Sequence, residues 1–306
     1  MSDLKTIQSL YRDVTKAAVV GLLVNVLLGG MKLAGGLISG SFALIADAIN
    51  SIGDVVSTIV VLVGLKIAQR PPDEEHPYGH TRAEGIAASN VAVLIIVSAI
   101  LVAWESLQRL HGPTSIPPLW AIGIAAVNVV IKELLYQYNA AVGKRTGSAA
   151  MQANAWDHRS DALCSLAVLG GLGVIRIGGE EYGWADEIAS ILVALIIAWS
   201  GARLFKASAS ELMDVQADSD LVDAIRQAAR NVPGVEDVET LWVRKSGIEF
   251  FADIHIEVDQ NLSVEEGHAI GHRVKAKLVD GFVNLRDVLV HIEPFPHSRD
   301  DAPENR

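Results

Sequence analysis

Two short stretches place paired polar side chains inside apolar runs. Residues 46–54 read Ala-Asp-Ala-Ile-Asn-Ser-Ile-Gly-Asp, and residues 153–161 read Ala-Asn-Ala-Trp-Asp-His-Arg-Ser-Asp, which is the same pattern of residue types. Each ends in two oxygen-bearing side chains four residues apart, Asn50 with Asp54 and Asp157 with Asp161, and this spacing puts each pair on one helix face. A carboxylate at bilayer depth is costly unless it is paired or ligated. The four side chains therefore predict one buried cation site.

A polar loop between two apolar segments carries a second group of metal-ligating residue types. Asp73, His76 and His80 follow the spacing Asp-x-x-His-x-x-x-His. One carboxylate and two imidazoles suit a small tetrahedral metal site, with water or a glutamate as the fourth ligand. The alternative is an ordinary solvated turn, because the loop is rich in Pro, Gly and charge.

Other polar residues also fall inside the apolar segments, and four of them bear on the predicted site. Asp47 shares a stripe with the first pair, as an accessory ion contact or as a structural residue near a helix end. His158 lies about 100° round the helix from its neighbouring aspartate and would join the site only if the helix rotates or bulges. Lys32 and Lys132 either neutralise nearby carboxylates or line a water-filled cavity.

The composition separates a membrane part from an acidic, water-soluble part. The chain is 50% hydrophobic with a mean hydropathy of +0.32, which is too apolar for an ordinary soluble protein. Residues 1–208 carry 16 acidic and 15 basic side chains, whereas residues 209–306 carry 20 acidic and 10 basic ones. An acidic surface excludes nucleic acid as a partner and suits metal cations. Cys164 is the sole cysteine, so an internal disulfide and a thiolate zinc cluster are both excluded.

The apolar segments predict a six-helix domain embedded in the lipid bilayer. Each is near the ~20 residues that a bilayer requires, and they cover residues 17–39, 42–66, 86–108, 119–142, 151–177 and 184–206. Most Lys and Arg residues at the segment ends lie on one side, so the positive-inside rule places both termini in the cytoplasm. The two matching stretches then run in opposite directions, as expected for a three-plus-three inverted repeat with a site near the midplane.

The acidic part predicts a small α+β domain. Helical spacing at residues 221–231 is followed by strand patterns at 238–244 and 250–259, a helix at 263–279 that opens with a Ser-x-x-Glu cap, and a strand at 286–294. In the second strand His255 points away from the apolar face, and His291 and Glu293 share one face of the last strand. A solvated acidic face and a second metal station are the two interpretations. The predicted organisation is a cytoplasmic segment at 1–16, the six-helix transmembrane domain at 17–208, the αββαβ domain at 209–296 and a disordered tail at 297–306.

Together these residues resemble the cation diffusion facilitators, over about residues 5–296. The features that carry the resemblance are the paired sites in the second and fifth helices, the Asp-x-x-His-x-x-x-His loop and the short αββαβ domain, in this order. The resemblance implies a homodimeric, multi-pass antiporter that moves a divalent transition metal out of the cytoplasm, or into an organelle, in exchange for protons. A bacterial-type inner membrane is the expected location.

The resemblance also assigns roles to individual residues. Asn50, Asp54, Asp157 and Asp161 match the transport site, and the three loop residues match a second cytoplasmic site. The positions that match a regulatory metal site in the C-terminal domain are His255, His268, His291 and Glu293, with Glu239 standing where some relatives have His. Arg82 and Asp214 match a charge interlock near the dimer interface.

The ligand types favour manganese as the cargo. Zinc-handling relatives commonly begin one or both helical pairs with His, whereas this site offers four oxygen donors. Oxygen ligands favour harder ions, so Mn²⁺ is expected first, Fe²⁺ second and Zn²⁺ third. A metal sensor or scaffold of the same fold and a membrane-embedded metalloenzyme are the alternatives. The enzyme is disfavoured because there is no His-Glu-x-x-His helix.

Overall fold

The computed structural model describes residues 2–39, 42–109, 119–178 and 184–296. Within the helices some side chains fall outside the description, and those of Asp47, Asn50 and Cys164 are among them. The predicted disordered tail at 297–306 also lies outside the described residues. By its internal contacts the chain divides into two compact units, Leu10–Ala209 and a second unit that contains Ser210–Arg306.

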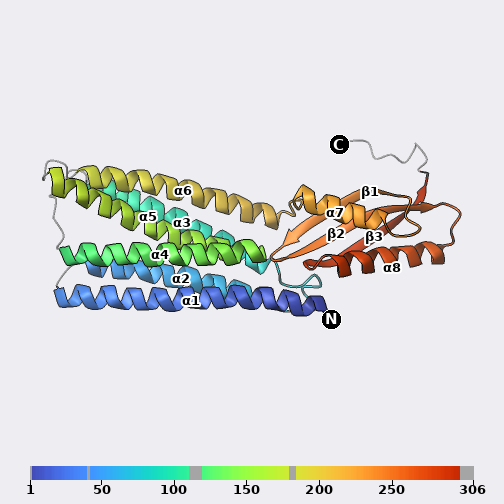
Figure 1. Cartoon of the computed structure of the whole chain (residues 1–306), viewed down its shortest axis with the longest axis horizontal. Coiled ribbons are helices and arrows are strands. Elements are labelled where there is room, and N and C mark those ends of the chain that lie inside the picture. Colours follow the sequence, from blue (N-terminus) through green and yellow to red (C-terminus); the bar gives the residue numbers. More distant parts are fainter. Residues whose placement is uncertain (1, 40–41, 110–118, 179–183, 297–306) are drawn as a thin grey trace. The chain divides into compact units, whose positions relative to one another are not determined.

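The first unit consists of long helices that lie side by side (Figure 1). The six predicted apolar helices are confirmed as helices, namely α1 (Ser2–Ser39), α2 (Phe42–Ala68), α3 (Ala83–Arg109), α4 (Leu119–Thr146), α5 (Ala149–Gly178) and α6 (Trp184–Leu212). By length and hydropathy alone, two described stretches qualify as membrane spans, Ile7–Ala34 and Ala83–Gln108.

A tight turn places α4 directly against α5. Gly147 has a φ of 73°, in the left-handed region that glycine adopts without strain, so α4 ends at Thr146. Ser148 Oγ then accepts a hydrogen bond from the backbone N–H of Met151 at 3.1 Å, which caps the start of α5. This short connection makes the two helices antiparallel neighbours and brings Lys132 of α4 beside the polar stretch of α5.

Helices α2 and α3 approach each other closely at a glycine. A Cβ on Gly64 would overlap Ala87 Cβ, so a larger residue at this position would push the helices apart. Helix α3 also packs on α5, and α2 packs on α5. Helices α2, α4 and α5 are thereby held as one group, and α2 and α5 carry the predicted transport site.

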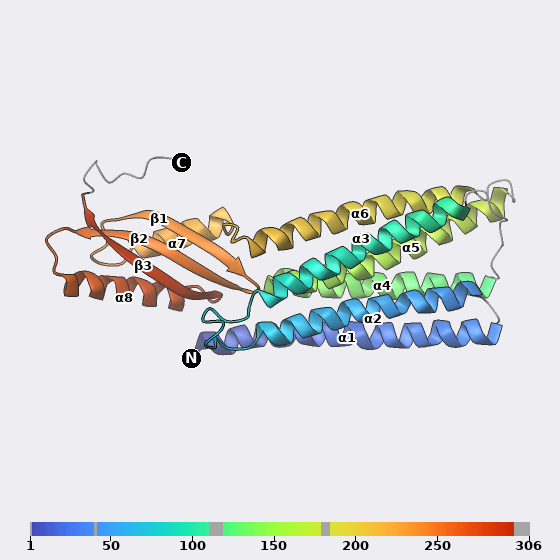
Figure 2. The ribbon, with the colours of Figure 1, turned by 180° about the vertical axis from the view of Figure 1, so that it is seen from behind.

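The C-terminal domain is the predicted αββαβ unit. It comprises α7 (Ser219–Arg230), β1 (Asp237–Ser246), β2 (Glu249–Asp259), α8 (Val264–Gly281) and β3 (Leu285–Phe295). The sheet has the order β1-β2-β3, with β1 antiparallel and β3 parallel to β2 (Figure 2). The predicted cap of α8 is confirmed, because Ser263 and Glu266 form a reciprocal capping box.

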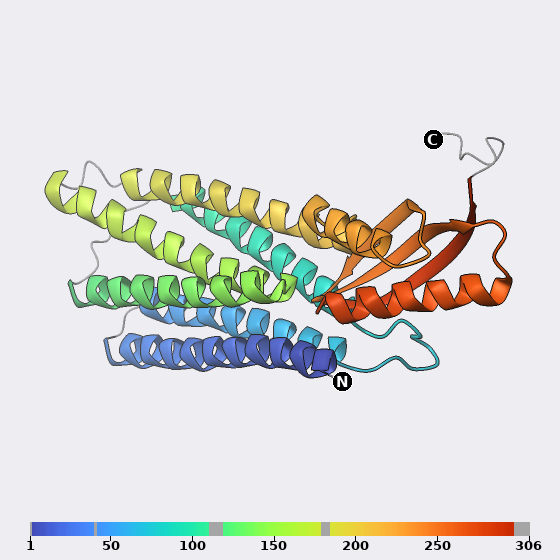
Figure 3. The same ribbon diagram turned by 45° about the vertical axis from the view of Figure 1, so that its right-hand side comes forward.

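One face of this sheet is buried beneath both helices. The shared core includes Ile225 of α7, Val274 of α8 and Ile254 of β2, each with 0% exposure, and α8 runs along β3 (Figure 3). Because side chains alternate along a strand, His255 must then face the other side of the sheet. The fold therefore leaves one sheet face available for polar chemistry.

Candidate metal centre

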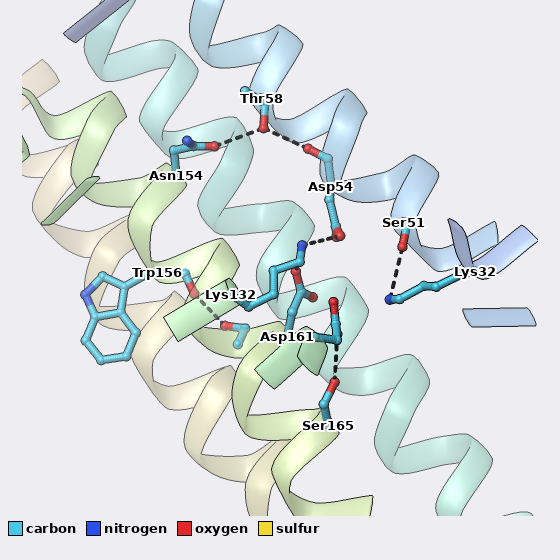
Figure 4. A network of polar contacts seen from close by, with 11 residues as sticks. Lys32, Ser51, Asp54, Thr58, Lys132, Asn154, Trp156, Asp161 and Ser165 are labelled. Atoms are coloured by element: carbon cyan, nitrogen blue, oxygen red, sulfur yellow. Dashed lines mark hydrogen bonds and ion pairs between the residues drawn. The ribbon is translucent and has the colours of Figure 1, made fainter. Parts of the chain in front are cut away.

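Three helices bring a lysine and two aspartates together inside the first unit. Lys132 of α4 donates hydrogen bonds from Nζ to Asp54 Oδ2 at 2.6 Å and to Asp161 Oδ2 at 2.8 Å. The side chains are 2%, 9% and 20% exposed in the order Lys132, Asp54, Asp161. Figure 4 shows the ammonium between α2 and α5. The interpretation that Lys132 neutralises neighbouring carboxylates is therefore confirmed.

The third carboxylate of the predicted site is buried and incompletely satisfied. Asp157 is 8% exposed, and its Oδ2 has no hydrogen-bond partner among the described residues. It lies one helical turn before Asp161, on the same face of α5. A buried carboxylate oxygen without a partner is costly and is therefore a natural acceptor for a cation.

The remaining members of the predicted site are placed by their backbone only. Asn50 lies in α2 one turn before Asp54, and Asp47 lies nearly one turn earlier. Their side chains lie outside the described residues, so their roles as ligand and as accessory contact stay predictions. Lys32, the other buried lysine considered from the sequence, donates from Nζ to Ser51 Oγ at 3.3 Å.

A hydrogen-bonded link between α2 and α5, which could not be predicted from the sequence, lies beside the carboxylates. Thr58 Oγ1 lies 2.9 Å from the backbone oxygen of Asp54 and 3.2 Å from Asn154 Oδ1, which links α2 to α5.

His158 is fully buried, and a Cβ on Gly21 would lie 3.2 Å from its Nε2 and 3.6 Å from Asn139 Nδ2. His158 is thus directed towards α1, and its role as an accessory ligand stays a prediction.

The loop between α2 and α3 brings its three predicted ligands together. The ligand atoms of Asp73, His76 and His80 lie within 4.8 Å of one another. The backbone N–H of His76 donates to Asp73 Oδ1 at 2.7 Å, and this bond holds the pKa of that carboxyl below its usual range. Gly79, with a φ of 85°, allows the chain to turn between the two imidazoles. The group fits a small, solvent-accessible metal site.

The uncovered face of the C-terminal sheet holds a second compact group. His255 and His291 are paired across β2 and β3, and their rings are 4.8 Å apart. His255 Nδ1 lies 2.7 Å from Glu293 Oε1, and His291 Nε2 lies 3.5 Å from the same oxygen. The structure thus unites three of the residues that the resemblance assigns to a regulatory site, although metal binding there stays a prediction.

The other residues assigned to the C-terminal site lie apart from this group or at its edge. Glu239 Oε2 is 3.9 Å from His255 Nδ1, which is close enough to contribute charge. His268 instead contacts His272 on α8, with 3.0 Å between their Nε2 atoms, and shares the lining of a surface pocket of about 410 Å³ with Glu293.

The two residues of the predicted charge interlock, Arg82 and Asp214, belong to different units. Asp214 lies 3.8 Å from the guanidinium of Arg244 within the C-terminal domain. The interlock between Arg82 and Asp214 stays a prediction.

The sheet-face group should bind metal in the isolated C-terminal domain. Residues 209–296 include a continuous hydrophobic core and should fold alone. Because two imidazoles and a carboxylate suit first-row metals, calorimetry should detect a site for Zn²⁺ or Mn²⁺ that His255→Ala weakens by at least about tenfold. The control His272→Ala should leave this site intact. Absence of binding to the wild-type domain would reduce the group to a solvated sheet face.

Comparison with known proteins extends the likeness over almost the whole chain. The family model for the cation efflux transmembrane domain matches residues 18–213, and that for the cation efflux cytoplasmic domain matches residues 217–295. The manganese efflux system protein MneP of Bacillus subtilis is 31% identical over 92% of this chain and 96% of its own length. The magnetosome protein MamB of Paramagnetospirillum magneticum is 34% identical over 85% of this chain and 88% of its own.

Among solved structures, that of a single-residue variant of the MamM CTD is similar to the C-terminal domain. It is 31% identical, covers 24% of this chain and 92% of its own, and has a TM-score of 0.24.

Proposed function

We propose that this chain, which belongs to the cation diffusion facilitator family and is a metal cation efflux transporter, exports Mn²⁺ in exchange for protons. The family assignment makes the chain an integral membrane protein and not an enzyme. The observation that carries the proposal is the group formed by the buried Asp54 and Asp157 and the partly buried Asp161 on α2 and α5. Carboxylates inside membrane-spanning helices are costly, and they mark ion pathways more often than they serve packing alone.

The exchange follows from competition for one set of oxygens. Asp54, Asp157 and Asp161 can each accept either a metal ion or a proton, and the low dielectric makes an uncompensated charge on all three unfavourable. Arrival of a divalent cation would therefore displace protons, and release of the cation would allow protons to return. Alternating exposure of this one site to the two sides of the membrane would couple the two fluxes in opposite directions.

Manganese is supported by donor chemistry and by a relative. The four predicted donors, with Asn50, are all oxygens, which suit Mn²⁺ better than Zn²⁺. The relative from Bacillus subtilis is named as a manganese efflux protein. Fe²⁺ is the second expected cargo and Zn²⁺ the third.

The loop and the C-terminal domain fit supporting roles in this transporter. Asp73, His76 and His80 would bind a metal in the cytoplasmic loop, and His255, His291 and Glu293 would bind a regulatory metal. The matched cytoplasmic-domain family supports a homodimer joined through this domain. Both termini are proposed to be cytoplasmic, in keeping with the distribution of Lys and Arg.

Transport by the purified protein in proteoliposomes tests the function directly. Initial uptake rates should be highest for Mn²⁺, lower for Fe²⁺ and lowest for Zn²⁺ and Co²⁺, and a pH indicator should report proton movement in the opposite direction. Metal flux without proton movement would contradict exchange, and a clear preference for Zn²⁺ would contradict the assignment of the cargo.

A further inference from the structure

Lys132 holds two of the oxygens that the metal is expected to use. Its ammonium donates at 2.6 Å to Asp54 Oδ2 and at 2.8 Å to Asp161 Oδ2, from a side chain that is 2% exposed. Metal–oxygen bonds in such sites are about 2.0–2.2 Å long. An ion bound by these two carboxylates would therefore lie within a few ångströms of the ammonium, and their repulsion is strong in a buried environment.

We propose that Lys132 is a tethered cation that occupies the site between Asp54 and Asp161 in the metal-free transporter and must be displaced when metal binds. This proposal rests on the proposed function of the carboxylates as the transport site. Lys132 is not a metal ligand in this account, because an ammonium has no lone pair to donate. It determines how tightly the cargo is held and how readily it leaves.

The lysine also changes the net charge of the site, which affects how readily the metal is released. Three aspartates and one lysine, with the neutral Asn50, carry a formal charge of −2. One divalent cation balances this charge, whereas the aspartates alone would leave an excess negative charge after the metal had bound. A site whose charge the bound ion just balances attracts that ion less strongly than a more negative site does. The metal therefore dissociates more easily when the lysine is present.

A purely structural role for Lys132 makes a different prediction. The lysine ties α2, α4 and α5 together, and removal of one partner of a buried ion pair is strongly destabilising when the remaining charge stays unpaired. If this were its only role, its loss would disturb the ligand geometry, so metal affinity and transport would fall together. A tethered competitor should instead produce tighter binding with slower turnover.

The experiment compares binding and transport in the full-length protein. Lys132→Met removes the charge at nearly constant length, Lys132→Arg keeps it, and Lys144→Met removes a lysine from the exposed end of the same helix. Free Mn²⁺ is counted by electron paramagnetic resonance during titration of the detergent-solubilised protein. Uptake rates in proteoliposomes then give KM and the maximal rate.

Lys132→Met should bind Mn²⁺ at least about tenfold more tightly than wild type, as expected for removal of a close charge. Its KM and its maximal rate should both fall. The gain in affinity should be similar for Zn²⁺ and Co²⁺, because the lysine is not a ligand and repels every divalent ion alike. Lys132→Arg should bind Mn²⁺ less tightly than Lys132→Met, and Lys144→Met should behave as wild type.

Unchanged or weaker Mn²⁺ binding by folded Lys132→Met would overturn the proposal and leave the lysine as a structural tie. If that variant does not fold, Lys132→Gln is measured in its place, and failure of both to fold would likewise identify a structural tie. Failure of the proposed function is a separate result. Wild type that carries no Mn²⁺ would refute manganese export, whereas the binding comparison can still be made with any divalent ion that binds.

Discussion

Replacement of Asp161 by alanine should abolish metal uptake into proteoliposomes while the protein remains folded. Asp161 supplies one of the three carboxylates of the proposed site, is partly buried and contacts Lys132, so its loss removes both a proposed ligand and a counter-charge. Loss of a residue that only supports a metal ligand typically costs 10–100-fold in affinity or activity, and a direct ligand should cost at least about 100-fold. Initial Mn²⁺ uptake rates and the elution profile of the purified variant measure the two quantities.

A carboxylate on a neighbouring helix provides the matched control for this experiment. Glu133 of α4 follows Lys132 in the sequence, but its Oε1 accepts a hydrogen bond from Gln137 on the same helix. Glu133→Gln should therefore transport at close to the wild-type rate. Full transport by Asp161→Ala would refute the assignment of the α5 pair, and equal loss in both variants would indicate a general effect of removing a carboxylate from these helices.

The helices and strands could be predicted from the sequence because each is set by a local pattern. The apolar segments gave all six long helices, and the alternation of polar and apolar residues placed His255 on the uncovered sheet face, where it meets Glu293. Spacing also placed Asp157 and Asp161 on one face of α5. These are properties of a single element, and the periods of helices and strands determine them.

The contacts between elements could not be predicted in the same way. Lys132 bridges Asp54 and Asp161 because of the rotation of α4 about its axis and its close packing against α5. The spacing of residues within α4 determines neither of these. The link from Thr58 to Asn154 depends likewise on how α2 and α5 meet. Residues distant in sequence meet only after packing, so the sequence indicated a role for the lysine without its partners.

His268 shows the limit of assignment by position. The resemblance assigns it to the regulatory site with His255, His291 and Glu293. In the structure its Nε2 lies 3.0 Å from that of His272 on the same helix, and it lines a surface pocket together with Glu293. Helix α8 buries Ile270, Val274 and Leu278 against the sheet, and this packing directs His268 towards solvent. The role of His268 at a regulatory metal site therefore stays a prediction.

Replacement of Asn50 by histidine should shift the metal preference towards Zn²⁺. An amide oxygen ligates a cation without charge and without a titratable proton, so Asn50 would complete a set of oxygen donors. An imidazole in its place suits Zn²⁺ better than Mn²⁺ and takes up its own proton near neutral pH. The ratio of Zn²⁺ to Mn²⁺ uptake rates should rise by about tenfold, for a discrimination of ~1.4 kcal/mol, and the pH dependence of transport should change with it.

The variant Asn50→Asp separates the type of donor atom from its charge. It keeps an oxygen ligand at the same position in α2 and adds a fourth carboxylate, so Mn²⁺ transport should persist while competition by protons becomes stronger. Lys132→Met also makes the site more negative by one charge, but it should alter the affinity for every metal by a similar factor. Comparison of the two variants therefore separates the effect of the ligand at position 50 from the effect of charge alone. If the ratio of Zn²⁺ to Mn²⁺ rates is the same in wild type, Asn50→His and Asn50→Asp, then Asn50 does not select the metal, and the case for manganese loses its principal chemical support.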